Sequence, residues 1–396
     1  MGNPKRGGMG TAETTQPLGL EIDGTILGQT RLSEVDGPAR RLAYCGYDFH
    51  PLASHATWEE VVHLLWHDEL PTAAELGQLR ERLAAARPLS PDELALLRAV
   101  PTYGHGLDAV RTALALLAQF HELPIMQPET ILEQAITATA QLPTLVATLI
   151  RLRNGKPPIP PDPTLSHAAN FLWMLHGTAP DPVAVQALDT YMVVLAENGL
   201  NISTFVGAVV TSTRNDLGSA VIAALSTLKG LAHGGANEHA MRLFLAMGEP
   251  EQVPAALAAF VASKQRLMGV GHRIFEGEDP RVRHLRLQSA ALANRPFTDP
   301  HASMAHAVAE AVAAQVQQHP FFVQRKLHPN VEFYSAPLLY QLGFPLDYFT
   351  VAFACARMPG WIAHIAEQLT QPRLVRPEAR YVGAQAREFI PLAQRG

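Results

Sequence analysis

Signals for the start of a helix recur along this chain, and they constrain its fold more than any other feature. The segments 57–60 (TWEE), 72–75 (TAAE) and 90–93 (SPDE) each place Ser or Thr three residues before Glu. This is the pattern of a capping box, in which the hydroxyl and the carboxylate satisfy free N–H groups of the first helical turn. Apolar residues at helical spacing follow each box, so three helices are predicted here.

Helical spacing also runs through most of the remaining chain. It covers the ranges 130–153, 166–176, 182–197, 202–229, 236–247, 251–267, 301–317, 335–342 and 348–370. Alternating Val, Ile and Thr are nearly absent, apart from a short piece at 20–27 (LEIDGTIL). The proline-rich segment 156–163 reads as an extended connector, and no internal repeat indicates a solenoid. The sequence therefore predicts an all-α protein.

Length and composition narrow the class of protein. With 396 residues, 47% of them hydrophobic, the chain can bury a large core and form two domains. Apolar runs such as VGAVV and VATLI are much shorter than a membrane span, so we expect no membrane partner. Residues 1–16 lack the pattern of a secretory leader and are expected to form a disordered tail.

Cysteine content and charge add two expectations. Cys45 and Cys355 are the two cysteines, and they offer neither a disulfide framework nor the spacing of metal ligands. This favours a reducing, cytoplasmic location and predicts no metal site. A net charge of −5 argues against nucleic acid as the main partner. A soluble enzyme is the simplest interpretation.

Two of the 17 histidines lie where the helical spacing breaks beside glycine. His233 precedes Gly234 and Gly235, and His272 follows Gly271. A loop position gives a side chain access to a ligand, and glycine allows close backbone approach, so both are candidates for catalysis. A structural histidine at a helix end is the alternative for each. The others are interpreted as surface or packing residues, among them His63, His67, His167, His284, His301 and His306.

One carboxylate and three arginines occupy unusual places. Glu332 lies among apolar and aromatic residues just before a predicted helix. Burial there would raise its pKa toward the range useful for a general base, whereas stabilising the helix N-terminus is the equally weighted alternative. Arg281 follows an Asp-Pro turn, Arg357 interrupts an apolar run and Arg376 precedes a proline. An arginine in an apolar helix needs a carboxylate partner, from the protein or from a ligand.

At this point several motifs occur in the order that the citrate synthase family shows. They are HGGAN (233–237), GHR (271–273) followed by DPR (279–281), NVEFYS (330–335), R…GW (357–361) and RP (376–377). The segments 30–49, 55–71 and 159–177 resemble the amino-terminal half of the family. The resemblance extends from about Gly19 to Gly383, and the length resembles the shorter bacterial and archaeal dimeric form.

The resemblance implies a Claisen condensation of acetyl-CoA with oxaloacetate, followed by hydrolysis of the citryl thioester. It implies that His233 stabilises the enolate, that His272 polarises the ketone and that Glu332 removes the methyl proton. The implied substrate-binding residues are Asn198, Asn201, Arg281, Arg357 and Arg376, and the implied CoA-binding residues are Gly269, Val270, Gly271 and Arg273. The roles agree with the chemistry, because a weakly acidic methyl proton leaves only if the developing oxyanion is stabilised.

The resemblance also implies the architecture and the partners. The fold would be citrate synthase-like, with a large helical domain formed by 17–232 and 341–396. A smaller helical domain, 233–340, would close over the cleft. Oxaloacetate and acyl-CoA would be the substrates, with acetyl-CoA as co-substrate and no further cofactor. A homodimer is expected, in which Arg376 reaches the site of the partner subunit.

Three positions depart from the family pattern. Asn198 stands where the family has a histidine that binds oxaloacetate, so weaker binding or another keto acid is expected. Glu332 replaces an aspartate, which moves the carboxylate by about 1 Å, a displacement that can cost on the order of 10²-fold in rate. Glu276 replaces a cation suited to a CoA phosphate, for which Arg273 or Arg283 would have to compensate.

Three interpretations remain open on the sequence. The favoured one is an active condensing enzyme with retuned binding. A close variant is a 2-methylcitrate synthase that uses propionyl-CoA, since one methylene in a pocket is worth only about 1–3 kcal/mol. The third is a weakly active or inactive paralogue with a role in interaction or assembly. The enzyme is favoured because His233, His272 and all three arginines occur together.

Overall fold

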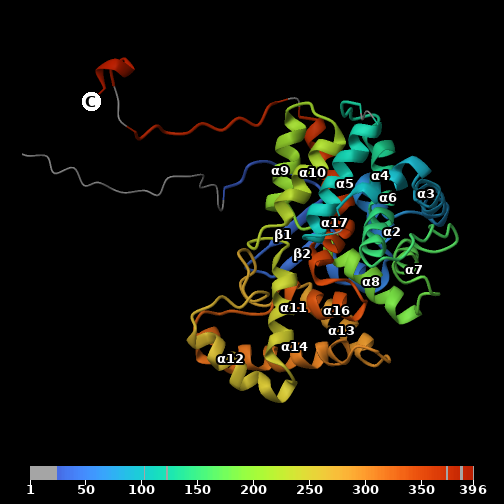
Figure 1. Cartoon of the computed structure of the whole chain (residues 1–396), viewed down its shortest axis with the longest axis vertical. Coiled ribbons are helices and arrows are strands. Elements are labelled where there is room, and N and C mark those ends of the chain that lie inside the picture. Colours follow the sequence, from blue (N-terminus) through green and yellow to red (C-terminus); the bar gives the residue numbers. More distant parts are fainter. Residues whose placement is uncertain (1–24, 102, 122–123, 372, 384–386, 396) are drawn as a thin grey trace, which may run out of the picture.

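The computed structural model describes residues 25–101, 103–121, 124–371, 373–383 and 387–395, and it is mostly helical (Figure 1). The predicted tail 1–16 lies outside these residues. The helices are α1 (Phe49–His55), α2 (Trp58–His67), α3 (Ala73–Ala86), α4 (Pro91–Ala99), α5 (Gly106–His121), α6 (Ile131–Arg153), α7 (His167–His176), α8 (Pro182–Leu195), α9 (Ile202–Ser212), α10 (Leu217–Leu228), α11 (Ala236–Met247), α12 (Val253–Ala262), α13 (Val282–Ala293), α14 (Pro300–Gln318), α15 (Pro320–Val323), α16 (Val331–Gln341) and α17 (Phe349–Leu369). Short 3₁₀ turns are η1 (Pro250–Gln252), η2 (Leu346–Tyr348) and η3 (Leu392–Gln394). The predicted all-α class is confirmed.

The three capping boxes begin α2, α3 and α4, as predicted. In α3, the Thr72 hydroxyl accepts from the N–H of Glu75 at 3.3 Å, and the Glu75 carboxylate accepts from the N–H of Thr72 at 2.8 Å. Each exchange satisfies two N–H groups that have no partner within the helix. Local sequence alone therefore determines where these helices begin.

Three predicted helical ranges were wrong. The helix predicted at 251–267 is α12, which begins at Val253 and ends at Ala262. The run 202–229 is two helices, because the chain turns at Arg214, whose φ of 62° is left-handed, and the Asp216 side chain then caps α10. The helix predicted at 335–342 begins at Val331 instead, after its N-cap Asn330. Glu332 therefore lies in the first turn of α16 and not before it.

A small antiparallel sheet precedes the helices and was not predicted. Its strands are β1 (Ser33–Asp36), β2 (Arg41–Tyr44) and β3 (Tyr47–Asp48), in the order β1-β2-β3. Ser33 pairs with Tyr44 and Asp36 with Arg41 across the β1–β2 hairpin. In the described part of the apolar piece 20–27, Ile26 and Leu27 are exposed and lie outside any strand.

Helix α17 runs through the centre of the core, and residues 349–365 are all buried. It packs against α2, α6, α8, α9 and α10. Gly360 lets it touch the end of α8, because a Cβ at this position would lie 2.2 Å from the carbonyl oxygen of Ala196. Arg357, Trp361 and His364 follow one another at helical spacing on α17, so they lie along the same side of the helix.

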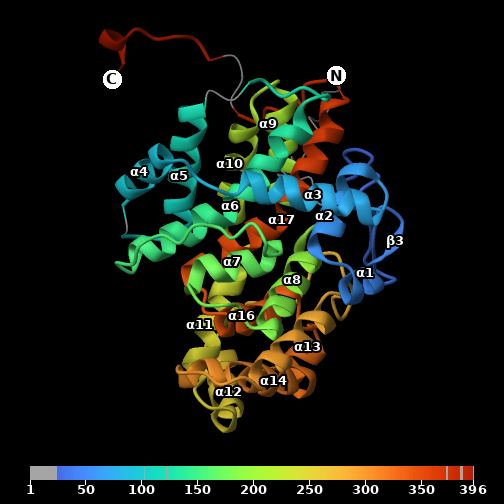
Figure 2. The same ribbon diagram turned by 90° about the vertical axis from the view of Figure 1, so that its right-hand side faces the viewer.

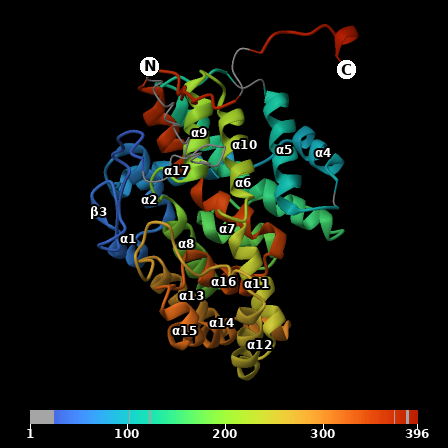
Figure 3. The same ribbon diagram turned by 90° about the vertical axis from the view of Figure 1, so that its left-hand side faces the viewer.

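The elements of residues 233–340 gather at one end of the molecule. Figures 1, 2 and 3 all show α11, α12, α13, α14 and α16 toward the lower end of the molecule, and Figure 3 shows α15 there as well. The proposed division into a large domain (17–232 and 341–396) and a small domain (233–340) stays a prediction. Helix α6 is long and apolar enough to cross a membrane, but 72% of its apolar window is buried within the fold, as in the core helix of a soluble protein.

Candidate active site

His233 lies in the tight turn that joins α10 to α11. A Cβ on Gly234 would lie 2.7 Å from Leu228 Cγ, and a Cβ on Gly235 would lie 2.7 Å from the carbonyl oxygen of Lys229. Real side chains do not approach backbone this closely, so glycine is required where the chain folds back. The two glycines therefore place the imidazole at the junction of two helices.

A shared hydroxyl group holds the His233 ring. Nε2 lies 2.8 Å from Ser203 Oγ, which also accepts from the Trp361 indole N–H at 3.2 Å and lies 2.8 Å from Asn201 Oδ1. Burial is the main reason that the pKa of His233 falls to about 4, and the positive charge of Arg357 lowers it further. The ring is therefore neutral at neutral pH. Its Nδ1 has no hydrogen-bond partner among the described residues and can serve a ligand.

His272 is held in a single tautomer. Its Nδ1 accepts from the backbone N–H groups of Ile274 and Phe275, each at 3.0 Å. The neutral ring must therefore carry its proton on Nε2. Burial, and then the charge of Arg281, lowers the pKa of His272 to about 4, although Asp279 opposes this. Nε2–H is thus a fixed, neutral hydrogen-bond donor.

The segment before His272 is pinned to the start of α16. Gly269 and Gly271 have left-handed φ values of 81° and 90°. Asn330 donates from its backbone N–H to the Gly269 carbonyl at 2.9 Å and from its side-chain Nδ2 to the Gly271 carbonyl at 2.8 Å. Gly269, Val270 and Gly271 therefore join the His272 loop to the helix of Glu332. The predicted binding of CoA by these residues and by the exposed Arg273 stays a prediction.

Glu332 offers a carboxylate that the fold leaves available. Its backbone N–H donates to the N-cap side chain of Asn330 at 3.1 Å, which fixes the first turn of α16. No hydrogen bond or ion pair joins the carboxylate to another described residue. Burial raises its pKa, against the opposing charge of Arg281, a hydrogen bond from its own backbone N–H and the charge of Arg357. A desolvated, unpartnered carboxylate of this kind is suited to a general base.

Arg281 is buried and is held by Asp279. The Arg281 Nε donates to Asp279 Oδ1 at 2.9 Å and Nη2 donates to Oδ2 at 2.7 Å. The Arg281 backbone N–H also donates to Oδ1 at 3.0 Å. Burial would lower the pKa of Arg281, but Asp279 more than offsets this and raises it. The guanidinium is therefore fixed in orientation, with Nη2 3.4 Å from His272 Nε2.

Arg357 is fully buried in α17 and has an unpaired donor. Its Nε donates to the carbonyl of Leu195 at the end of α8, while Nη2 has no hydrogen-bond partner among the described residues. The guanidinium lies 5.0 Å from the centre of the Phe353 ring. Burial lowers its pKa, against the charge of Glu197. An unsatisfied buried guanidinium donor is costly unless an anion binds it.

The two histidines, Glu332 and the two buried arginines act on one another electrostatically. The charge of Arg281 lowers the pKa of His272 and of Glu332, and the charge of Arg357 lowers the pKa of His233 and of Glu332. The structure thus combines two neutral imidazoles, one carboxylate of raised pKa and two buried guanidinium groups. This arrangement defines an acid–base enzyme that acts on an anionic substrate.

Asn198 and Asn201 lie near this site in different settings. Asn198 is half-buried, and its Oδ1 is buried without a partner. Asn201 caps α9, accepting from the N–H of Thr204 at 3.3 Å, and its Nδ2 donates to the Gly199 carbonyl at 3.3 Å. The side chain of Asn201 thus supports the fold locally, whereas Oδ1 of Asn198 remains available to accept a hydrogen bond.

Glu197, beside Asn198, was not a predicted site residue. Its Oε1 accepts from His364 Nε2 at 3.0 Å, from the Ser33 hydroxyl at 2.9 Å and from the Gly199 N–H at 2.5 Å. Burial would raise its pKa, but His364 and Arg357 together lower it. Burial would likewise lower the pKa of His364, but Glu197 raises it. The two side chains form a buried ion pair.

Arg376 does not join the site within one chain. Its side chain is exposed, and Nη1 donates weakly to the carbonyl of Pro377 at 3.5 Å. The preceding residue, Val375, donates to the hydroxyl of Ser212 at the far end of α9. Ser212 is nine residues beyond Ser203, or about 13 Å along the helix axis. From there the C-terminal segment extends away from the helices (Figure 1).

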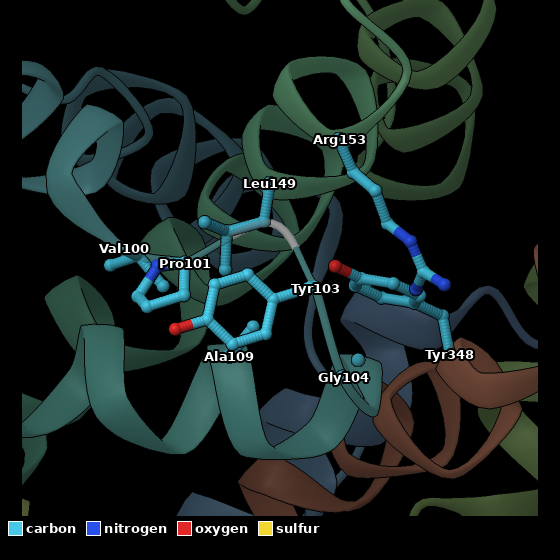
Figure 4. Close-up of a pocket in the computed structure, with 9 residues that line it drawn as sticks. Val100, Pro101, Tyr103, Gly104, Ala109, Leu149, Arg153 and Tyr348 are labelled. Carbon is cyan, nitrogen blue, oxygen red and sulfur yellow. The ribbon is translucent and has the colours of Figure 1, made fainter.

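A separate surface pocket, shown in Figure 4, contains none of the predicted site residues. Its lining comes from residues 100–101 and 103–104 between α4 and α5, from the start of α5, from α6 and from η2, and it includes Tyr103, Arg153 and Tyr348. Arg153 is already paired with Asp347, which also accepts from the N–H of Gly106 at 2.8 Å. In the described part of the chain, no group of three or more His, Cys, Asp or Glu residues could hold a metal ion.

Sequence reasoning missed the residues that orient this site. They are Asp279, Ser203, Trp361, Glu197 and His364. Asp279 was visible as the acid of the DPR motif, but its pairing with an arginine two residues later has no distinctive spacing. Ser203 and Trp361 are 158 residues apart in the sequence, so their shared hydrogen bond arises only in the fold.

Comparison with known proteins agrees with this chemistry. The family model "Citrate synthase, C-terminal domain" matches residues 19–378. A citrate synthase of Haloferax volcanii is 37% identical over 94% of this chain and 98% of its own length, and 2-methylcitrate synthase 2 of Corynebacterium glutamicum is 34% identical over 97% and 100%. The crystallised Thermoplasma acidophilum citrate synthase, in complex with carboxymethyl coenzyme A and oxaloacetate, superposes with a TM-score of 0.87 at 28% identity, covering 94% of this chain and 98% of that one.

The chain therefore belongs to the citrate synthase family, and it is an enzyme of the carbon–carbon bond-forming acyltransferase type. The citrate synthase-like fold inferred from the sequence motifs is confirmed by the solved relatives. Relatives named citrate synthase and relatives named 2-methylcitrate synthase occur at similar identity. The percentage identity to these relatives therefore does not distinguish acetyl-CoA from propionyl-CoA as the substrate.

Proposed function

We propose that this protein condenses acetyl-CoA with oxaloacetate and hydrolyses the product to citrate and CoA. The observation that carries the proposal is the fixed Nε2–H of His272 beside the buried guanidinium of Arg281, whose charge also acts on the buried guanidinium of Arg357. A neutral donor next to buried cations suits a ketone that carries carboxylates. Bidentate pairing of carboxylates with arginine orients the ketone toward the donor.

In the proposed mechanism, Glu332 takes a proton from the thioester methyl group. His233 donates to the thioester oxygen as negative charge develops there. The Ser203 hydroxyl has one proton and two acceptors in reach, His233 Nε2 and Asn201 Oδ1. When it donates to His233 Nε2, the ring proton is on Nδ1, the nitrogen without a partner, and this nitrogen is the donor.

The enolate carbon then attacks the ketone carbon of oxaloacetate. The ketone oxygen becomes an alkoxide that accepts a hydrogen bond from His272, and it takes up one proton, which balances the proton that Glu332 removed from the methyl group. Water subsequently cleaves the thioester and releases CoA. Because His233 and His272 have pKa values of about 4, both remain neutral donors at neutral pH. The reaction as proposed needs no metal ion and no cofactor beyond the acyl-CoA co-substrate.

A homodimer is also proposed, with Arg376 acting in the site of the partner subunit. Helices α9 and α10 pack together and leave Phe205, Val206, Val209 and Ile222 only half-buried. The C-terminal segment carries the exposed apolar residues Leu374, Tyr381 and Val382. A second copy would cover both sets of residues, in the way that isologous interfaces bury the same patch on each subunit. We further propose a cytoplasmic location, supported by two cysteines that form no disulfide within the described chain.

The function is tested by measuring CoA thiol release from acetyl-CoA and from propionyl-CoA, each with oxaloacetate. Release that disappears in Glu332→Gln establishes the condensing enzyme, and the ratio of the two rates decides between citrate and 2-methylcitrate synthesis. A faster rate with propionyl-CoA would support the second candidate, which the relatives named 2-methylcitrate synthase favour. Absence of release with both thioesters would contradict the proposal and point to an interaction role.

The dimer is tested by mixing two inactive variants, Glu332→Gln and Arg376→Ala, after dissociation and reassembly. A hybrid dimer contains one site with Glu332 from one subunit and Arg376 from the other. If Arg376 acts across the interface, about a quarter of the wild-type sites are restored in a random mixture. Activity that stays at the sum of the separate variants would place Arg376 in its own subunit or outside the site.

A further inference from the structure

The β1–β2 hairpin contacts two segments of the candidate site that are far apart in the sequence. One is the segment 197–199, which carries Asn198. The other is the loop 272–277, which begins with His272. Figure 1 shows β1 and β2 between the level of α9 and that of α11, and Figure 3 shows β3 beside α1. The hairpin is thus a structural link that the mechanism above does not use.

At the base of the hairpin, Ser33 is bonded to both neighbours of Asn198. Its hydroxyl donates to Glu197 Oε1 at 2.9 Å and accepts from the N–H of Gly199 at 2.9 Å. Val35, two residues later on the same face of β1, approaches Gly199 so closely that a Cβ there would lie 3.3 Å from Val35 Cγ2. The strand therefore fixes the backbone on each side of Asn198.

At its turn, the hairpin contacts the His272 loop through Gly37. The Gly37 carbonyl accepts from the N–H of Glu276 at 3.2 Å. A Cβ on Gly37 would lie 2.1 Å from the carbonyl oxygen of Ile274 and 2.8 Å from its carbonyl carbon. The N–H of the same Ile274 donates to Nδ1 of His272 and helps to fix its tautomer. The absence of a side chain at Gly37 therefore permits the contact that supports His272.

The loop needs such support because its own backbone does not restrain it. Residues 272–278 form no helix or strand, and Gly271 and Gly277 at either end have left-handed φ values of 90° and 120°. By contrast, β1 and β2 are hydrogen-bonded over their full length, and Tyr44 of β2 donates to the Glu197 carbonyl at 2.8 Å. Gly37 lies four positions after Ser33 along the extended strand, a span of about 13 Å.

We infer that the hairpin is a positioning element for the reaction, in which Ser33 and Gly37 set the distance between the Asn198 segment and the His272 loop. It would act on the binding and polarisation of the keto acid and not on the acyl-CoA. This inference rests on the proposed function. Neither Ser33 nor Gly37 is placed in contact with a substrate, so their effect is transmitted through Glu197, Gly199 and Ile274.

The test compares Gly37→Ala with Gly77→Ala, a helical glycine whose added Cβ meets nothing within 4 Å. Gly37→Ala is expected to raise the KM for oxaloacetate, and to lower kcat, each on the order of 10-fold. The KM for acyl-CoA should change less than about two-fold, and Gly77→Ala should match the wild type in all three. Equal changes in both KM values, or none, would overturn the inference.

Hydrogen exchange of the peptide 272–278 provides a readout that does not depend on activity. The N–H groups of Ile274, Phe275 and Glu276 should exchange faster in Gly37→Ala than in Gly77→Ala. Unchanged exchange would overturn the inference, even if the wild type proved inactive with both thioesters. An inactive wild type with faster exchange in Gly37→Ala would instead refute only the proposed function and leave the support of the loop established.

Ser33 supplies a second pair of variants should Gly37→Ala fold poorly. Ser33→Ala removes both hydrogen bonds to the Asn198 segment, whereas Ser33→Thr keeps the hydroxyl in a strand that accommodates a β-branched residue. The alanine variant should show the same selective rise in the KM for oxaloacetate, and the threonine variant should restore it. Equal behaviour of the two variants would contradict a role for the hydroxyl.

Discussion

Asp279 holds Arg281 with both carboxylate oxygens, at 2.9 Å and 2.7 Å. Both side chains are almost completely buried, and Arg281 Nη2 in turn lies 3.4 Å from His272. One carboxylate therefore orients the cation that faces the proposed ketone donor. The family resemblance implied that Arg281 binds substrate, and the structure shows that the orientation of Arg281 depends on an acid two residues earlier.

Asp279→Asn is expected to weaken oxaloacetate binding and to destabilise the fold. It leaves a buried guanidinium without a counter-charge, a change that typically costs about 3–5 kcal/mol. The KM for oxaloacetate should rise on the order of 10-fold, since the cation loses its fixed orientation. Steady-state kinetics and urea denaturation measure the two effects. The matched control is Glu278→Gln, one residue earlier and exposed. A similar loss in both variants would argue against a specific role for Asp279.

Glu332 should set the acidic limb of the pH–rate profile. Burial raises its pKa above the usual 4.5, and a general base works only when ionised. Turnover should therefore fall as the pH falls through a value above 4.5, while His233 and His272 stay neutral down to about pH 4. Glu332→Gln should lose turnover by on the order of 10²-fold or more. A profile with its acidic limb at or below pH 4.5 would contradict this assignment.

Ser203→Ala should reduce turnover without abolishing it. The substitution removes the partner of His233 Nε2 and leaves the buried Trp361 N–H unsatisfied. The expected losses are about 10-fold in kcat and about 1–3 kcal/mol in the free energy of unfolding. Ser226→Ala on α10, where the hydroxyl bonds only to its own helix, serves as the control. Unchanged turnover in Ser203→Ala would mean that His233 is oriented by packing alone.

The Glu197–His364 pair predicts how stability depends on pH. The pKa of His364 is raised above 6.5, so its contribution is fully present below 6.5 and is lost as the pH rises through the raised value. The pKa of Glu197 is lowered below 4.5, so its contribution is present above 4.5 and is lost as the pH falls through the lowered value. The pair should thus stabilise most between pH 4.5 and 6.5.

His364→Gln should accordingly lose most free energy of unfolding in that window and least well above it. Urea denaturation from pH 4 to 9, with the exposed His301→Gln as control, provides the measurement. A difference from the wild type that is constant across this range would show that the loss comes from packing and not from charge.

Local features of the fold were predictable from sequence, and non-local ones were not. The capping boxes of α2, α3 and α4 involve residues three apart, so the sequence displays both partners. The hairpin was missed because its strands are short and carry charged residues such as Glu34 and Arg41. The break between α9 and α10 was missed because Arg214 adopts a left-handed conformation that glycine or asparagine usually signals.

The candidate site likewise has features that the sequence shows and features that only the fold creates. His233 and His272 could be singled out because glycines beside them mark breaks in the helical pattern. Their tautomers could not be predicted, because they depend on hydrogen bonds that form only in the fold, from the N–H groups of Ile274 and Phe275 to His272 and between Ser203 and His233. Arg357 shows both cases: its place in an apolar run was visible, but its bond to Leu195 joins residues 162 apart in the sequence.

The contact of Gly360 with Ala196 has a consequence for how the enzyme can evolve. A Cβ at position 360 would meet the Ala196 carbonyl at 2.2 Å and Glu197 Oε2 at 2.7 Å, so α17 could accept a larger residue only by moving away from α8. Such a movement would displace Arg357 and His364 together. A single substitution at this glycine would therefore act on both side chains at once. The segments 198–201 and 272–277 lie outside the helices, so a substitution in them leaves α17 in place.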